Sequence, residues 1–138
     1  MSEAQNAALA RRVIDEAFNN KRSEAVRELL HPKAVGHLEG FEVRGPEGFL
    51  PAWASSLGAF PDLKVVIQDL MAQGDSVAVR WTASGMHTGP HLGIAPSMKL
   101  VAFRGITWLR FSEGKIIEWW ESWNQGRLFS ELQQARKD

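Results

Sequence analysis

The sequence predicts an α+β domain in which helical segments come first and extended segments follow. In roughly the first sixty residues, apolar side chains recur every three or four positions, the period of an amphipathic helix. After Ala59-Phe60-Pro61-Asp62 the period changes to two, and β-branched and aromatic residues fill long runs of the second half. No linker, repeat or low-complexity segment divides the 138 residues, so we expect a single domain over 1–138. Helices followed by an antiparallel meander favour helices that cover one curved face of a sheet and enclose a cone-shaped pocket.

The first two of three N-terminal helices have recognisable start and stop signals. Ser2 with Gln5 has the pattern of a capping box, and one apolar stripe follows over Glu3–Asn19. Ser23 is suited to cap a second, short helix, and His31-Pro32 ends it because the residue before proline disfavours the helical region.

The third helix follows a short extended piece, Val35–Leu38, and a loop, Glu39–Gly45. Pro46 suits the first helical turn, and a helical stripe follows, formed by Phe49, Leu50, Trp53, Ala54 and Leu57. Pro51 conflicts with a regular helix from Pro46, so either the first turn is irregular or the regular helix begins near Pro51.

Two strands, a loop and a hairpin complete the chain. Leu63–Gln73 and Ser76–His87 read as strands joined by a turn at Gly74-Asp75. Thr88–Ser97 is a loop because of its glycines and prolines, and Gly126–Arg136 forms a short closing helix after the hairpin.

The hairpin Val101–Asn124 is the stretch around which the chain is organised. If Glu113-Gly114 is a two-residue loop, Ser112 faces Lys115 and the register of the whole pair follows. One face, which we interpret as a cavity wall, then carries Phe103, Gly105, Thr107, Leu109, Glu118, Trp120, Ser122 and Asn124. The other face carries Arg104, Ile106, Trp108, Arg110, Ile117, Trp119, Glu121 and Trp123, which suits packing against another subunit. A bulge would exchange the faces beyond it, so Arg110 belongs to either face.

Composition excludes several classes of function. Acidic and basic residues balance at 16 each, and six tryptophans have no basic patch beside them, so we expect no nucleic-acid partner. The absence of cysteine excludes disulfides and thiolate chemistry. No apolar run is long enough to span a membrane, and the N-terminus has no signal-peptide pattern, so we expect a cytoplasmic protein without a membrane partner.

A series of short motifs resembles the SnoaL-like polyketide cyclase (ester cyclase) branch of the NTF2-like superfamily. In chain order, these motifs are Val35-x-His37, Ala59-Phe60-Pro61-Asp62, Gly74-Asp75 with Val77-Ala78-x-Arg80-Trp81, Gly85-x-His87-x-Gly89, Gly93-x-x-Pro96, and Arg110-x-x-x-Gly114-Lys115-Ile116-x-Glu118-x-Trp120. The resemblance covers almost the whole chain. It implies an NTF2-like cone with an apolar cavity, homo-oligomers, and chemistry without a metal or an organic cofactor. It also implies closure of a ring by an intramolecular aldol reaction in which an aspartate moves the proton.

The chain departs from the family pattern at the position of that aspartate. Four residues after Trp120, following Glu121-Ser122-Trp123, the chain has Asn124, and an amide cannot take a proton near neutral pH. In one interpretation Asn124 orients a substrate carbonyl while His87, His37 or Glu118 takes the proton. In the other, which we favour, the aldol chemistry has been lost and Asn124 satisfies a buried hydrogen bond.

The candidate catalytic residues are therefore His87, Asn124, His37, Arg110 and Glu118. Histidine titrates near physiological pH, an arginine can stabilise an oxyanion, and a buried carboxyl becomes a base when its pKa rises. As structural alternatives, the histidines are satisfied side chains at strand ends and Arg110 pairs with Glu118 or Glu121. His91 lies four residues after His87 on a loop, where that spacing does not align ligands, so we expect no metal site.

The candidate substrate-binding residues are Phe18, Trp53, Phe60, Arg80, Phe103 and Trp120. The aromatic members of this set are equally suited to a core. The function predicted is binding of a small apolar, polyketide-like molecule, with a cyclase, isomerase or hydratase type of activity. The alternatives are a non-catalytic binding or assembly module and a SnoaL-like hydroxylase. The aromatic outer face of the hairpin, with Arg104, Trp108, Trp119 and Trp123, predicts a homodimer.

Overall fold

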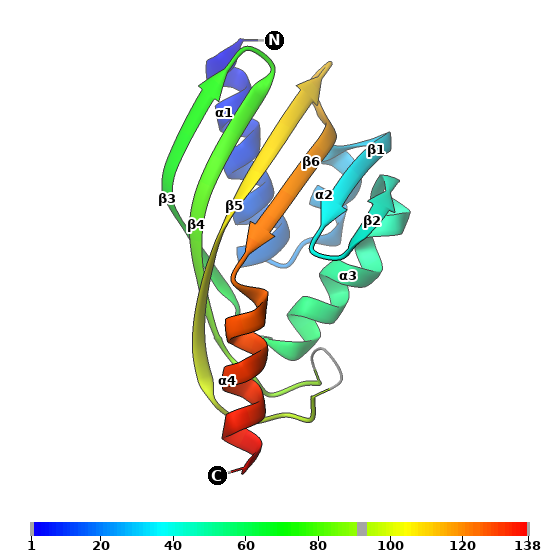
Figure 1. Cartoon of the computed structure of the whole chain (residues 1–138). Helices are drawn as coiled ribbons and strands as arrows, with labels where there is room; N and C mark the ends of the chain where they lie inside the picture. The colour runs from blue at the N-terminus through cyan, green and yellow to red at the C-terminus, as the bar shows by residue number, and fades with distance from the viewer. Residues whose placement is uncertain (1, 91–93, 138) are drawn as a thin grey trace.

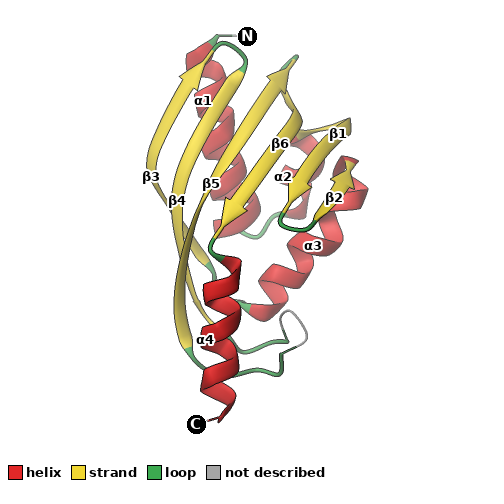
Figure 2. Ribbon diagram, in the orientation of Figure 1, coloured by secondary structure: helices red, strands yellow, loops and turns green. Residues whose placement is uncertain are grey.

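The structure is a computed structural model that describes residues 2–90 and 94–137, with side chains described up to residue 134. Helices lie against one face of a six-stranded sheet (Figures 1 and 2). The N-terminal helix lies at one end of the molecule and the C-terminal helix at the other (Figure 1).

The N-terminal helical segments begin with α1, Glu3–Arg12, which continues directly into a π-helix, η1, Val13–Asn19. The capping box is confirmed, because the Gln5 amide donates to Ser2 Oγ over 3.1 Å and the Ser2 amide donates to Gln5 Oε1 over 2.8 Å. The change to π geometry was not predicted, because the apolar stripe continues through it.

The next segments differ more from the sequence prediction. Helix α2, Ser23–Leu29, leads straight into strand β1, Leu30–Leu38. Residues predicted as loop form a short strand, β2, Phe41–Arg44, which pairs with β1 as an antiparallel hairpin. Helix α3, Gly45–Ala59, keeps Pro51 inside it.

The second half of the chain follows the predicted order. The strands are β3, Lys64–Gln73; β4, Ser76–Met86; β5, Leu100–Ser112; and β6, Lys115–Trp123, and the closing helix is α4, Gln125–Lys137. Within the predicted loop 88–97, residues 91–93, and with them His91, lie outside the described residues.

The sheet has the order β2-β1-β6-β5-β4-β3. Neighbouring strands are antiparallel except β1 and β6, which are parallel. The prediction of a purely antiparallel sheet is therefore wrong at this one pair. Strand β1 comes from the N-terminal half and lies beside the last strand, a long-range pairing that local sequence patterns do not encode.

The core lies between the helices and the inner face of the sheet. Buried apolar residues come from every layer, including Ala10, Ala17, Val26, Phe60, Val77, Val79, Ile116 and Leu132. Helix α1 packs on β3 and β4, and α3 packs on β1 and β2. The apolar side chains between the two layers do not fill this space completely, which leaves the cavity described next.

Candidate active site in an apolar cavity

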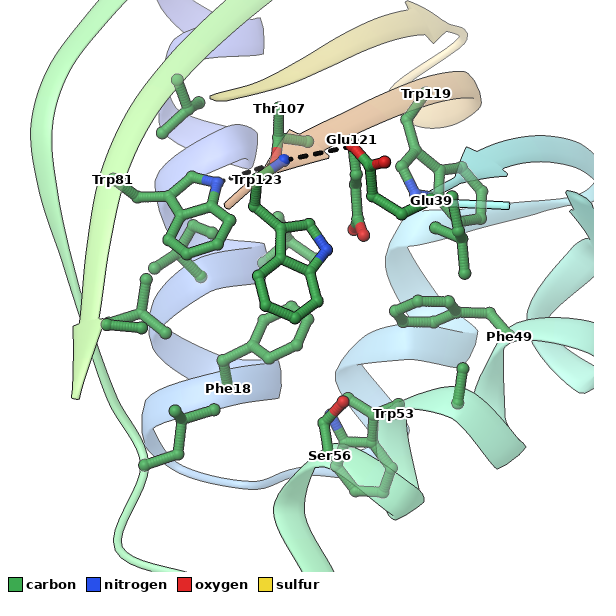
Figure 3. A pocket seen from close by; sticks show the side chains of 18 of the residues that line it. Phe18, Glu39, Phe49, Trp53, Ser56, Trp81, Thr107, Trp119, Glu121 and Trp123 are labelled. Atoms are coloured by element: carbon green, nitrogen blue, oxygen red, sulfur yellow. Dashed lines mark hydrogen bonds between the residues drawn. The ribbon is translucent and has the colours of Figure 1, made fainter. Parts of the chain in front are cut away.

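A cavity of about 280 Å³ lies between the helices and the inner face of the sheet (Figure 3). Its wall is mostly apolar, and its aromatic residues are Phe18, Phe41, Phe49, Trp53, Phe60, Trp81, Phe103, Trp119 and Trp123. Such a concave, apolar space with a few polar groups is the usual form of a small-molecule site.

The π-helix places two of these aromatic residues. Ala17 lies in the last turn of η1, where carbonyls have no partner within the helix, and its carbonyl accepts a hydrogen bond of 2.8 Å from the indole N–H of Trp53 on α3. Phe18, the next residue, packs edge-on against Phe49 with ring centroids 6.4 Å apart. The irregular turn therefore joins η1 to α3 at the cavity wall.

Strand β6 presents the opposite face from the one predicted. Ser112 does face Lys115, but the register shifts by one residue between Phe111 and Arg110. Glu118 therefore pairs with Arg110, whereas the predicted register pairs it with Leu109. The bulge turns Trp119, Glu121 and Trp123 toward the cavity, and Glu118 and Trp120 away from it. The predicted assignment of these β6 faces is wrong for this reason, whereas Phe103, Thr107 and Leu109 of β5 line the cavity.

Glu121 is the polar group that stands out in the cavity. Burial raises the pKa of its carboxyl to about 7, the charge of Glu39 adds to the rise, and a hydrogen bond with Trp119 opposes it. Glu39 lies beside it in the turn between β1 and β2, where its Oε1 accepts from the backbone amide of Trp123 over 3.3 Å. Figure 3 shows the two carboxyl groups next to each other and that of Glu121 directed into the cavity.

A second polar group on the wall is already paired. The Thr107 hydroxyl accepts a hydrogen bond of 2.9 Å from the indole N–H of Trp81. Gly105 makes this arrangement possible, because a Cβ there would lie 2.6 Å from both Trp81 and Trp123. Trp81 and Trp123 can therefore approach each other across β5.

Four predicted substrate-binding residues, Phe18, Trp53, Phe60 and Phe103, line the cavity. The other two, Trp120 and Arg80, do not line the cavity. Trp120 is 38% exposed on the outer face of the sheet because of the bulge. Arg80 is exposed on the outer face of β4, where alternation along the strand places it.

Three predicted catalytic residues also lie outside the cavity, in one outer-face cluster. The carboxylate of Glu118 accepts from Arg110 over 2.6 Å and contacts His37 Nε2 over 2.8 Å. His37 Nδ1 lies 2.8 Å from Glu42, and the His37 ring stacks on Trp120 with centroids 5.3 Å apart. Arg110 therefore forms an ion pair with Glu118, which is one of the two structural roles expected for it from the sequence.

His87 is fully buried behind the cavity wall, with its ring packed on Phe60 at 5.5 Å between centroids. Its Nδ1 accepts from the Ser97 amide over 3.1 Å and lies 2.9 Å from Ser97 Oγ, so the side chain fastens the segment before β5. Burial lowers the pKa of His87, so the ring is held neutral. Its Nε2 has no hydrogen-bond partner among the described residues.

Asn124 lies at the junction of β6 and α4. Its Oδ1 accepts from the Arg104 amide over 3.0 Å, and its carbonyl accepts from the Leu128 amide at the start of α4. The side chain is thus engaged with backbone, and it is not among the residues that line the cavity.

The sequence prediction missed Glu121 and Glu39 as site residues. One signal could have found Glu121. Opposite charges favour directly opposed positions across two strands, and Arg110 opposes Glu118 only if β6 contains a bulge. The same bulge turns Glu121 toward the cavity. In the described part of the chain, no group of three or more His, Asp or Glu side chains gathers in a metal-binding arrangement. No helix in the same residues is long and apolar enough to cross a membrane.

The chain is similar to one curated protein and to several solved structures. The aklanonic acid methyl ester cyclase AcmA of Streptomyces galilaeus is 30% identical over 117 residues, which cover 82% of this chain and 80% of AcmA. Among solved structures, the candidate hydroxylase AclR of Streptomyces galilaeus superposes with a TM-score of 0.87 at 29% identity, covering 96% of this chain and 83% of AclR. The candidate polyketide cyclase IdmH of Streptomyces antibioticus superposes with a TM-score of 0.80 at 30% identity, covering 93% of this chain and 98% of IdmH.

The family model for SnoaL-like polyketide cyclases matches residues 8–132, which include the sheet, the residues that line the cavity, and all of the helices except the start of α1 and the end of α4. The chain belongs to the SnoaL-like polyketide cyclase family.

Proposed function

We propose that the protein is a cofactor-independent enzyme that binds an apolar, polyketide-like molecule in the cavity and uses Glu121 to move a proton. The observation that carries this proposal is the pKa of about 7 of a carboxyl group on the wall of an apolar cavity. A group with a pKa near the working pH is present in both its acid and its base form, which is the condition for efficient general acid–base catalysis.

An intramolecular aldol reaction fits this group. Ionised Glu121 removes a proton from the carbon next to a carbonyl, and the resulting enolate attacks a second carbonyl of the same molecule. A carbon–carbon bond forms, and Glu121 returns the proton to the new alkoxide, so the mass of the molecule is unchanged. The aromatic walls limit access of water to the enolate.

Glu121 lies three residues before Asn124, the position at which the resemblance implies an aspartate. We therefore propose that the proton-transfer group has moved along β6, and that Asn124 has a structural role in joining β6 to α4. This proposal replaces His87, His37 and Glu118 as the candidate bases, and it departs from the interpretation favoured from the sequence, in which the aldol chemistry has been lost.

The test is incubation with a polyketide methyl ester that has two carbonyl groups positioned for aldol closure, followed by chromatography and mass analysis. We expect a product of unchanged mass and new retention time, and a rate that falls about 100-fold or more in Glu121→Gln. The matched control is Glu118→Gln on the outer face of the same strand, which should retain the rate. Equal rates in Glu121→Gln and the wild type would contradict the role of Glu121.

A hydroxylase is the second candidate, favoured by the superposition on AclR at 29% identity. The same mass analysis separates the two, because hydroxylation adds one oxygen atom to the product. Bound but unchanged substrate would instead support a non-catalytic binding module.

We also propose that two copies of the chain pair through the outer face of the sheet. The residues exposed there include Ile106, Trp108 and Trp120, which are 52%, 49% and 38% exposed. The aromatic face expected from the sequence keeps Trp108 but loses Trp119 and Trp123 to the cavity, because of the bulge in β6.

A further inference from the structure

The cavity has charges of one sign. Its charged lining residues are Glu39 and Glu121, and no lysine, arginine or histidine lines it within the described part of the chain. The remaining polar lining residues, Ser55, Ser56, Thr107 and Gln125, are uncharged. A ligand with a carboxylate or phosphate would therefore bring a second negative charge into an apolar space without a cation to balance it.

The aromatic wall favours the opposite charge. The Glu121 carboxyl projects between Trp123 and Phe49, with Trp119 beside it (Figure 3). Ring faces attract cations through their quadrupole, and an ammonium group among several rings and a carboxylate is the usual recognition pattern for organic amines. The ring packing is fixed by edge-on contact between Phe49 and Trp119, with centroids 5.4 Å apart.

From this geometry we propose that the cavity selects apolar ligands bearing a single ammonium group, which lies against Glu121 among the aromatic rings, and rejects apolar acids. The inference rests on the proposed function only in taking the cavity as the ligand site. It goes beyond that function in naming the charge of the preferred ligand. A neutral ester remains a permitted ligand, and an amine is a preferred one.

Proton linkage sharpens the prediction. An ammonium ligand requires Glu121 to be ionised, and the pKa of this group is about 7 in the free protein. The fraction ionised therefore rises about tenfold between pH 6 and pH 8, and amine affinity should rise with it. The other titratable group facing Glu121 is Glu39, from the turn between β1 and β2; the lining residues from η1, α3 and β5 carry no titratable side chain.

Calorimetry with three probes of one shape tests the proposal. The probes share a naphthalene ring and differ in the side group. The amine is N-methyl-1-(naphthalen-2-yl)methanamine, the ether is 2-(methoxymethyl)naphthalene, and the acid is (naphthalen-2-yl)acetic acid, which is a carboxylate at these pH values. At pH 8 we expect the amine to bind about tenfold or more tightly than the isosteric ether. We expect no detectable binding of the acid, and a loss of most of the amine preference at pH 6.

Two variants assign the effect to the carboxyl group. Glu121→Gln should abolish the amine preference and its pH dependence while the ether binds as before, which also shows that the cavity is intact. Glu118→Gln, on the same strand but the outer face, should change none of the three affinities. The proposal is overturned if the ether or the acid binds as tightly as the amine, if the preference survives Glu121→Gln, or if no probe binds at millimolar concentration.

The outcome is separable from that of the proposed function. Selective amine binding without turnover of any polyketide would contradict the enzyme and leave the ligand preference standing. Turnover of a polyketide ester that depends on Glu121, without amine selectivity, would do the reverse.

Discussion

At the scale of single residues, the site depends on one carboxyl group in an environment that disfavours its ionised form. Glu121 lies on an apolar wall beside a second carboxyl group, and both features favour its protonated form. A residue with this environment makes the folded protein less stable whenever it is ionised, and it is retained in functional sites where the raised pKa serves chemistry. The sequence could not reveal this, because Glu121 is one of 16 acidic residues until the bulge turns it inward.

Replacing Glu121 with Gln should therefore stabilise the protein at alkaline pH. The pKa of Glu121 rises from an ordinary 4.5 to about 7 on folding. Between these values the unfolded chain has lost the proton and the folded protein keeps it, so the free energy of unfolding falls as pH rises, by roughly 3 kcal/mol in total. We expect Glu121→Gln to be more stable than the wild type at pH 8, by about 2–3 kcal/mol beyond any difference at pH 5.

Urea unfolding at the two pH values measures this change. His87, whose lowered pKa gives the opposite trend at acid pH, is present in both proteins and cancels in the comparison. Glu24→Gln serves as the control, since Glu24 lies on an exposed position of α2. An identical gap between wild type and Glu121→Gln at pH 5 and pH 8 would show that Glu121 is not buried as a protonated acid.

At the scale of secondary-structure elements, local sequence patterns correctly predicted the features that depend on residues close in sequence. The capping box at Ser2, the turn at Glu113-Gly114 and the alternation along β5 each involve neighbours in sequence, and all three are present. A bulge in the hairpin was allowed for but not located, and the π-helix was not predicted, because each adds one residue to a regular period without breaking the run of apolar side chains. These two irregularities place Phe18, Trp119, Glu121 and Trp123 on the cavity wall, so this part of the site could not be read from periodicity alone.

The contact of β1 with β6 gives a prediction at this scale. Gly36 of β1 pairs with Trp119 of β6, and a Cβ on Gly36 would lie 2.2 Å from the indole ring. Gly36→Ala should therefore push Trp119 out of place and lower the free energy of unfolding by about 1–3 kcal/mol. A matched glycine is available in α3, where a Cβ on Gly58 would meet nothing within 4 Å.

Thermal unfolding of the two variants checks this prediction. Gly58→Ala should leave stability unchanged or raise it by about 0.5–1 kcal/mol, because alanine is the better helix former. Gly36→Ala should unfold at a lower temperature and bind cavity ligands more weakly, since Trp119 lines the cavity. If both variants were equally stable, the close approach of β1 to Trp119 would be disproved.

At the scale of the whole molecule, the two faces of the sheet have different chemistry. The inner face carries the cavity, whereas the outer face carries ion pairs around a row of apolar side chains. Cross-strand neighbours place Met71, Ala78, Trp108 and Trp120 in that row, from β3 across to β6, and His37 of β1 lies at its end. The order of the elements was predictable, but the position of β1 beside β6 was not, because nothing in either strand specifies so distant a partner.

The row predicts the assembly of the protein. An apolar stripe across four strands is the kind of surface that is usually covered by a partner, and a two-fold pairing of equal faces buries the same residues twice. We expect the wild type to sediment as a dimer at micromolar concentration. Trp108, in the middle of the row and 49% exposed, should tolerate a charge in the monomer but not in the dimer.

Trp108→Glu should therefore sediment as a monomer while its circular dichroism and its binding of the naphthalene ether stay unchanged, since Trp108 faces away from the cavity. Gln133→Glu, on an exposed position of α4, adds the same charge away from the sheet and should leave the dimer intact. A wild type that sediments only as a monomer would refute the pairing. A dimer that survives Trp108→Glu would place the interface elsewhere, because a dimer formed through this row buries two copies of the new carboxylate.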